Sequence, residues 1–299
     1  MFTHIAVLGA GTMGTRIAKF FVYNKVRVSL YDPNEKMLSK AKFDLCIHES
    51  LQNYLYFEKN LKKAVSNADL IIESVPENLE IKQNLYEQLT PIVKEGVVIC
   101  SNTSSFSLAS LSNKQVLESQ MIITHFFNPA DIIPLVEIVQ SEKTKEGICD
   151  QIVSFFKSCG KVPVVLRKDC KGFIANRLQA AVLREACFLL ENGIADASDI
   201  DKVMVEGIGF RWAFEGPFSI TDQGGLDIWG SVCENLLPNL CDSKQVPTVL
   251  KKKIENNEFG IKNGIGFYNY ADINMELLLK KRQDLFHQLI HLRSEYSVI

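Results

Sequence analysis

The sequence has no apolar stretch long enough to cross a membrane, and it has no cysteine framework. Its first apolar run, Ile5 to Leu8, is followed at once by glycines, which does not fit a secretory signal peptide. The eight cysteines form no CxxC pair, so neither a zinc site nor structural disulfides are predicted. A formal net charge of -2 gives no reason to expect nucleic acid or an anionic membrane as a partner. We therefore expect a cytoplasmic protein without a metal.

The sequence does contain enough apolar residues for two folded domains. Its 299 residues are 46% hydrophobic and 23% charged, which is ordinary for a globular protein. Short apolar runs alternate with helical stretches in the first half, as expected for strands buried on both faces of a parallel sheet. These runs are 5–8, 26–31, 70–72, 97–100, 121–127, 135–139 and 164–166. We predict an α/β fold whose N-terminal domain is a Rossmann-type, doubly wound parallel sheet.

The second half has a different pattern, typical of helices with one apolar face. Residues 176–191 carry apolar side chains at helical spacing, and further helices are predicted at 198–206 and 275–294. Pro163 precedes the last strand-like run, which suits the first position of a strand or an edge strand better than a central one. We place the boundary after Lys168. Residues 1–168 then form the dinucleotide-binding domain, and residues 169–299 form a C-terminal all-helical domain.

A glycine motif directly follows the first predicted strand and opens the first predicted helix. In this position Gly9 permits a tight turn, Gly11 lets backbone amides approach a pyrophosphate, and Gly14 lets helix and strand pack closely. Asp32 ends the second predicted strand, where a carboxylate binds ribose hydroxyls and disfavours the 2′-phosphate of NADP. The alternative for Asp32 is a simple turn before Pro33. We predict an NAD site that includes Gly9, Gly11, Thr12, Met13, Gly14 and Asp32.

Several downstream segments resemble the 3-hydroxyacyl-CoA dehydrogenase family, including its lambda-crystallin-like and free-hydroxyacid branches. The resemblance covers residues 5–270 in the family's order and approximate spacing. It implies an NAD-dependent oxidoreductase, a role in fatty acid metabolism and a homodimer formed through the helical domain. The segments are Val75-Pro76-Glu77-Asn78, Ser101-Asn102-Thr103-Ser104-Ser105, His125-Phe126-Phe127-Asn128-Pro129, Leu135-Val136-Glu137, Gly172-Phe173-Ile174-Ala175-Asn176-Arg177 and Gly264-Ile265-Gly266-Phe267-Tyr268.

The resemblance implies four catalytic residues. His125 matches the family's catalytic histidine, and an imidazole titrates near neutrality, so it can accept the proton of an alcohol as hydride leaves. Glu137 matches the carboxylate that orients this histidine. Ser104 and Asn176 match the hydroxyl and the amide that hold the reacting oxygen. Outside the resemblance, Ser104 would be a turn residue and Asn176 a residue at a helix start.

The resemblance also implies ligand contacts. Glu77 and Lys82 match residues near the nicotinamide ribose, with Lys82 a possible anchor for substrate, although a Glu/Lys pair on a helix surface is the alternative. Asn102 is assigned to the cofactor site and Asn128 to the substrate site. Arg211 suits a substrate carboxylate, or else a surface or dimer contact.

Three departures from the acyl-CoA enzymes bear on the substrate. The segment from Asp32 to Ala68 is too short for the helical arm that helps those enzymes hold CoA, Pro134 replaces a common lysine, and residues 209–214 are closer to the other branches. The main prediction is oxidation of an L-3-hydroxyacyl-CoA, such as 3-hydroxybutyryl-CoA, to the 3-oxoacyl-CoA. One alternative is a dehydrogenase of a free 3-hydroxy acid, such as an L-gulonate- or carnitine-like compound. The other is an NAD-binding protein without turnover.

Overall fold

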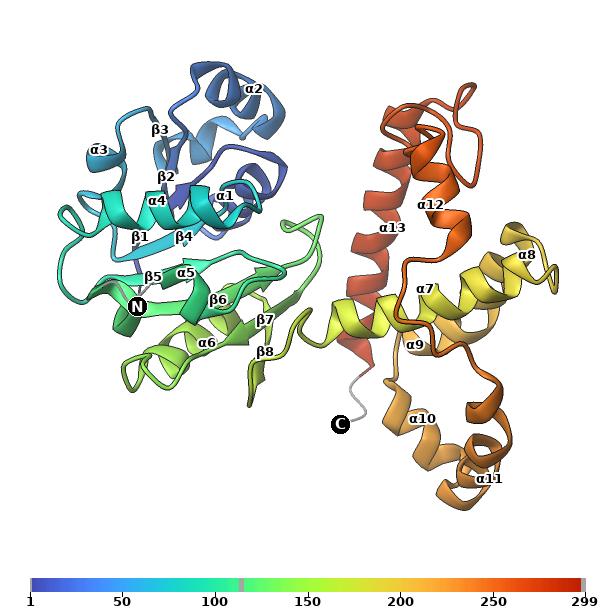
Figure 1. Ribbon diagram of the computed structural model, residues 1–299. Coiled ribbons are helices and arrows are strands. Elements are labelled where there is room, and N and C mark those ends of the chain that lie inside the picture. The colour runs from blue at the N-terminus through green and yellow to red at the C-terminus, as the bar shows by residue number, and fades with distance from the viewer. Residues whose placement is uncertain (1, 113–115, 297–299) are drawn as a thin grey trace. The chain divides into compact units, whose positions relative to one another are not determined.

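The protein is built from two compact units, Met1–Ala175 and Asn176–Ile299. The computed structural model describes residues 2–112 and 116–296 (Figure 1). The first unit is an α/β layer structure, and the second consists of helices with a short loop region that contains two isolated β-bridges. This confirms the predicted fold class, a Rossmann-type domain followed by a helical one.

The first unit contains an eight-stranded sheet with the order β3-β2-β1-β4-β5-β6-β7-β8. Its central strands are almost wholly buried, which explains their continuous apolar sequences. The strands are β1 (His4–Leu8), β2 (Arg27–Tyr31), β3 (Leu55–Glu58), β4 (Leu70–Glu73), β5 (Val98–Ser101), β6 (Met121–Phe126), β7 (Leu135–Val139) and β8 (Val162–Leu166).

The sheet is parallel from β3 to β6, but β7 runs antiparallel to β6. Eight residues connect these two strands, which is too few for the crossover that a parallel pair requires. The reversal pairs His125 on β6 directly with Glu137 on β7. Strand β8 pairs only with β7 and forms the edge, as Pro163 predicts.

Helices cover both faces of this sheet. One face packs against α1, α2 and α6, and the other packs against α3, α4 and α5. Alternate residues of each strand therefore enter two separate cores. The helices of this unit are α1 (Thr12–Tyr23), α2 (Glu35–Leu45), η1 (Glu49–Tyr54), α3 (Leu61–Val65), α4 (Leu79–Leu89), α5 (Leu108–Ser112), η2 (Val116–Gln120) and α6 (Ile148–Ser158).

The second unit buries few of its apolar side chains. Among its described residues, the buried hydrophobic side chains are Cys187 and Ile220, and many large apolar side chains are exposed. None of the helices described is both long and apolar enough to span a bilayer. The helices are α7 (Ala175–Glu191), α8 (Ala197–Lys202), the π-helical turn η3 (Val203–Ile208), α9 (Gly209–Trp212), α10 (Pro217–Gly224), α11 (Leu226–Leu236), η4 (Leu237–Asn239), α12 (Thr248–Glu255) and α13 (Met275–Glu295).

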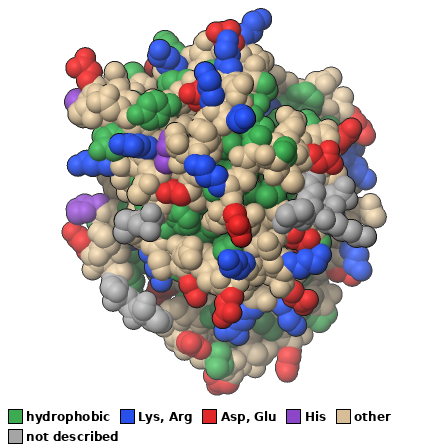
Figure 2. All heavy atoms as spheres, turned by 90° about the vertical axis from the view of Figure 1, so that its left-hand side faces the viewer, with side chains coloured by type: hydrophobic (Ala, Val, Ile, Leu, Met, Phe, Trp, Pro, Cys, Tyr) green, Lys and Arg blue, Asp and Glu red, His purple; other side chains and the backbone are tan. Residues whose placement is uncertain are grey.

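The surface in Figure 2 carries charges of both signs. Lysine and arginine side chains alternate with aspartate and glutamate side chains across this face, and hydrophobic atoms show between them. Such mixing agrees with the small net charge of the chain.

Candidate active site

The glycine turn between β1 and α1 has the geometry of a phosphate cradle. Gly9 has a φ of 108°, and an added Cβ would lie 2.5 Å from the Ser74 carbonyl oxygen. A Cβ on Gly14 would lie 1.8 Å from the Gly9 carbonyl oxygen, whereas a Cβ on Gly11 would meet nothing within 4 Å. Helix α1 begins without a side-chain cap at Gly11. Its first amides are thus directed into open space, where they suit an anion.

Asp32 lies at the end of β2 beside this turn. Its Oδ2 accepts a hydrogen bond from the Ala10 backbone N–H at 3.0 Å, and its Oδ1 accepts one from the Asn34 N–H at 2.9 Å. Asp32 therefore forms a turn at Pro33 through its bond to Asn34, and it also fixes the glycine loop through its bond to Ala10. Thr12 and Met13 occupy the first turn of α1. Together these residues fit the pyrophosphate and adenosine ribose of a dinucleotide.

Asn102 connects the ends of three neighbouring strands. Its Oδ1 accepts the Phe126 backbone N–H at 3.0 Å, and its Nδ2 donates to the Ser74 hydroxyl at 3.3 Å. The Asn102 backbone N–H also donates to the Glu73 carbonyl at 2.8 Å. Asn102 thus links the ends of β4, β5 and β6, close to where His125 lies near the end of β6.

His125 and Glu137 form a buried pair at this edge. The Nδ1 atom of His125 lies 2.9 Å from Oε2 of Glu137. Because an ionised carboxylate can only accept, Nδ1 is the donor, and in the neutral imidazole this leaves Nε2 as the proton acceptor. The rings of Phe127 and Phe173 lie 4.5 and 5.4 Å from the imidazole, centroid to centroid. The hydrogen bond to Glu137 fixes the tautomer, and the two aromatic rings fix the plane of the imidazole.

The Glu137 carboxylate is held in its charged form. Burial acts to raise the pKa of Glu137, but hydrogen bonds from His125 and from the backbone N–H groups of Ala175 and Ile174 outweigh it and lower the pKa. Both backbone bonds end on Oε1 at 2.9 Å. Glu137 therefore carries the negative charge that stabilises an imidazolium at His125.

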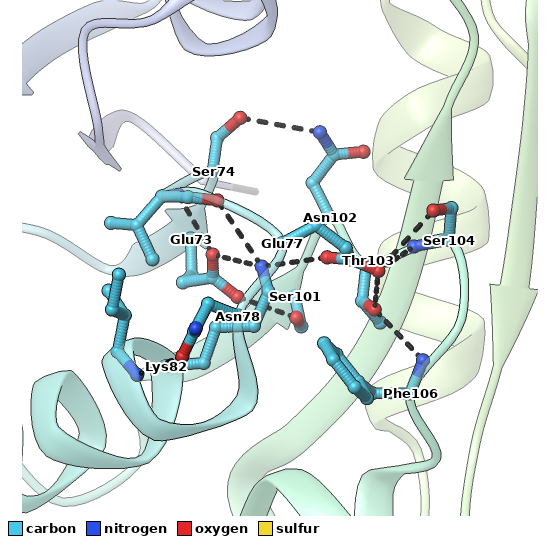
Figure 3. Close-up of polar contacts among 12 residues, drawn as sticks. Glu73, Ser74, Glu77, Asn78, Lys82, Ser101, Asn102, Thr103, Ser104 and Phe106 are labelled. Atoms are coloured by element: carbon cyan, nitrogen blue, oxygen red, sulfur yellow. Dashed lines mark hydrogen bonds and ion pairs between the residues drawn. The ribbon is translucent and has the colours of Figure 1, made fainter. Parts of the chain in front are cut away.

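Ser104 lies in a loop after β5 that is organised by Glu77 (Figure 3). Oε1 of Glu77 accepts hydrogen bonds from the Thr103 hydroxyl at 2.7 Å and from the Ser104 backbone N–H at 2.9 Å. It also accepts the N–H and the hydroxyl of Ser105. The Ser104 hydroxyl lies 3.3 Å from the same oxygen, which is long for a hydrogen bond between two oxygens. This weak contact leaves the Ser104 hydroxyl available to a ligand.

Lys82 is wholly buried, so it is not half of an exposed helix pair. Its Nζ donates to Oε1 of Glu73 at 2.6 Å and lies 3.3 Å from Oε2 of Glu77. Glu73 was not among the residues that the sequence indicated, although it ends β4 just as Asp32 follows β2. Applying the same strand-end rule to β4 predicts Glu73.

Lys161 is a second residue that the sequence did not indicate. Its buried Nζ donates to the carbonyl oxygens of Ala130 and Ile133 at 2.6 and 2.7 Å and lies 4.2 Å from the centroid of the Phe20 ring. Burial lowers the pKa of Lys161 to about 8, against the opposing effect of Asp131. Lys161 thus fastens the loop that follows His125. No sequence motif marks it.

The remaining predicted residues are Asn128, Asn176 and Arg211, and within the described part of the chain no hydrogen bond joins them to His125 or Glu137. Asn128 is exposed and precedes Pro129 through a cis peptide bond. Asn176 is the first residue of the second unit and follows Ala175 directly. Arg211 lines a cavity of about 450 Å³ within the second unit, together with Glu215, Gln223 and Trp229. Their functional roles stay predictions.

Comparison with known proteins gives matches over nearly the whole chain. Residues 4–170 match the family described as 3-hydroxyacyl-CoA dehydrogenase, NAD binding domain, and residues 172–270 match its C-terminal domain. The mitochondrial hydroxyacyl-coenzyme A dehydrogenase of Homo sapiens is 33% identical over 291 residues, covering 89% of this chain and 91% of the relative.

A second kind of relative acts on a different class of compound. The 5-formyl-3-hydroxy-2-methylpyridine 4-carboxylate 5-dehydrogenase of Mesorhizobium japonicum is 33% identical over 294 residues, which cover 94% of this chain and 95% of the relative. A crystal structure of an enzyme of this name, described as an NAD+ dependent dismutase, superposes with a TM-score of 0.94 at 31% identity. That match covers 99% of this chain and all of the other.

Proposed function

The chain belongs to the 3-hydroxyacyl-CoA dehydrogenase family, and on this premise we propose that it oxidises the hydroxyl group of a small free carboxylic acid. It is an NAD-dependent oxidoreductase, as its family is. The proposal thus concerns the substrate and the residues that act on it, and it reverses the order of the two substrate classes expected from the sequence.

The proposed chemistry rests on the pairing of His125 with Glu137. When bound, NAD+ supplies a nicotinamide ring that accepts hydride from the carbinol carbon. Nε2 of His125 takes the hydroxyl proton, and the carbonyl product forms as the C–H and O–H bonds break. Glu137 stabilises the resulting imidazolium through its 2.9 Å hydrogen bond to Nδ1. Ser104 is proposed to hold the substrate oxygen, and for Asn176 this role rests on the family resemblance alone.

The observation that carries the choice of a free acid is the connection between β2 and β3. Helix α2 is its one α-helix, and it contacts α1 and buries Leu38, Ala41 and Leu45 in the apolar core that it shares with that helix. The short turn η1 then leads directly into β3. No helix of this connection protrudes, so it offers none of the arm that the resemblance associates with CoA binding.

Two further observations support a free carboxylate. The 5-formyl-3-hydroxy-2-methylpyridine 4-carboxylate 5-dehydrogenase, whose name gives a substrate with a free carboxylate and a formyl group, matches this chain over almost its full length. Arg211 also has the planar fork of donors that suits a carboxylate, and it lines a cavity of the second unit. An acyl-CoA thioester is the second candidate, because the family model and the human relative are named for it.

The test compares free hydroxy acids with a CoA thioester, and it includes one pair, L-3-hydroxybutyrate and L-3-hydroxybutyryl-CoA, in which the acyl group is constant. NADH formation is followed by absorbance with L-3-hydroxybutyrate, L-gulonate, L-carnitine and a hydroxymethylpyridine carboxylate, and with L-3-hydroxybutyryl-CoA. We expect kcat/KM for at least one free acid to exceed the thioester value by about a hundredfold, the discrimination that lost polar contacts can produce. Turnover of the thioester alone would instead assign the protein to acyl-CoA chemistry.

A further inference from the structure

Three charged side chains form a compact cluster beneath the ends of β4 and β5. The cluster comprises Glu73, Lys82 and Glu77, with one ammonium group between two carboxylates (Figure 3). Glu73 and Lys82 have no exposed side-chain surface, and the Glu77 side chain is 36% exposed. We call these three residues the β4 acidic cluster.

The inner carboxylate of this cluster accepts hydrogen bonds on both of its oxygens. Oε1 of Glu73 accepts from the Val75 N–H at 2.9 Å and from Lys82 at 2.6 Å. Oε2 accepts from the Tyr86 hydroxyl at 2.8 Å and from the Ser101 hydroxyl at 2.6 Å. Burial and the charge of Glu73 raise the pKa of Tyr86 well above 10, so Tyr86 stays a donor. Glu73 is therefore held by a buried lysine on one oxygen and by two hydroxyl groups on the other.

The outer carboxylate, that of Glu77, is held in its charged form. Burial acts to raise the pKa of Glu77, but hydrogen bonds from Thr103 and Ser105 and the charge of Lys82 outweigh it and lower the pKa. One lysine therefore faces two glutamates, and the formal charges of the β4 acidic cluster (one positive, two negative) leave one uncompensated negative charge. Two of its three members are removed from water and Glu77 is 36% exposed, so solvent screens this charge only in part.

The sheet order places this charge at the nicotinamide half of the cofactor site. The glycine turn after β1 suits the pyrophosphate, and Asp32 after β2 suits the adenosine ribose. Strands β2 and β4 lie on opposite sides of β1. A dinucleotide held at β1 with its adenosine over β2 must extend its nicotinamide over β4 and β5, where the cluster lies.

We propose that the β4 acidic cluster makes the site discriminate between the redox states of the cofactor, favouring NAD+ over NADH relative to a neutral site. The nicotinamide ring of NAD+ carries a positive charge, and that charge disappears when the ring accepts hydride. A fixed negative charge therefore stabilises the oxidised form and leaves the reduced form almost unaffected. This inference rests on the family's NAD binding and is independent of the substrate proposal.

The test measures binding without turnover. Dissociation constants for NADH, from its fluorescence, and for NAD+, from displacement of NADH, are compared between the wild type and Glu77→Gln. The glutamine keeps an acceptor oxygen for the Ser104 loop and removes the charge. One unit charge acting over several ångströms near a protein surface predicts that Kd(NAD+)/Kd(NADH) rises by roughly threefold to tenfold.

Two controls separate charge from packing. Glu80→Gln removes one negative charge from an exposed position on the same helix, α4, and is expected to leave the ratio unchanged. Tyr86→Phe removes a neutral hydrogen bond to Glu73, so it perturbs packing and also leaves the ratio unchanged. If Glu77→Gln weakens both nucleotides equally, or changes neither, the proposal is wrong and Glu77 serves only to hold the loop.

Discussion

Replacing His125 by Gln is expected to lower kcat by about a hundredfold to ten-thousandfold, the usual contribution of a positioned general base. The side chain lies against Glu137 at the strand edge, and Nε2 is its one free proton acceptor. Glutamine retains a donor for Glu137 but has no basic nitrogen. The affinity for NADH should stay close to that of the wild type, because the glycine turn is formed by other residues.

His4→Gln provides the matched control for this variant. His4 begins β1, at the opposite end of the strand from the glycine turn, and its Nε2 lies 2.8 Å from the Ser29 hydroxyl. We expect His4→Gln to keep the kcat of the wild type, because His4 lies in the same sheet but away from the glycine turn. Stopped-flow measurement of NADH formation then distinguishes the two variants. Normal turnover by His125→Gln would remove His125 from the mechanism.

Gly14→Ala is expected to lower the stability of the fold, whereas Gly11→Ala is expected to lower the affinity for the cofactor. A methyl group on Gly14 would lie 1.8 Å from the Gly9 carbonyl oxygen, so α1 has to move away from β1. We expect a loss of roughly 1–3 kcal/mol in the free energy of unfolding, as for other overpacked sites. A methyl group on Gly11 meets no protein atom within 4 Å, so this variant should unfold almost like the wild type.

The Gly11 variant should instead lose cofactor affinity. Its methyl group would occupy the open space in front of the uncapped amides of α1, where the pyrophosphate has to approach. We expect its Kd for NADH to rise at least about tenfold, with urea unfolding as the measure of stability. Wild-type NADH binding by Gly11→Ala would show that the turn is not the phosphate site.

The doubly wound fold was predictable because apolar runs and glycine spacing are local signals. The runs 5–8, 70–72 and 135–139 all became strands, and the 3.6-residue pattern of 176–191 became α7. Strand direction is a long-range property, however, and the antiparallel turn of β7 was not predicted. Strand β3 was also not anticipated, because Leu55–Glu58 pairs at a sheet edge and is only partly buried.

The polar interior of the site was less predictable than its surface. His125 and Glu137 stand in recognisable segments, and register pairs them across β6 and β7. Lys82 was expected near the cofactor, but its burial between two carboxylates depends on Glu73, nine residues earlier at a strand end. Lys161 has no local signal at all, since its partners are backbone carbonyls about thirty residues away. Pairings of this kind are created by the fold rather than by any motif.

The most direct test of the account is to follow the hydrogen on the substrate's carbinol carbon. With a free hydroxy acid deuterated at that carbon, NAD+ and the wild-type protein, we expect one deuterium per turnover to appear on the reduced nicotinamide. The solvent should gain none. Deuterium released to water, or product formed without labelled NADH, would contradict hydride transfer from a free hydroxy acid and with it the proposed function.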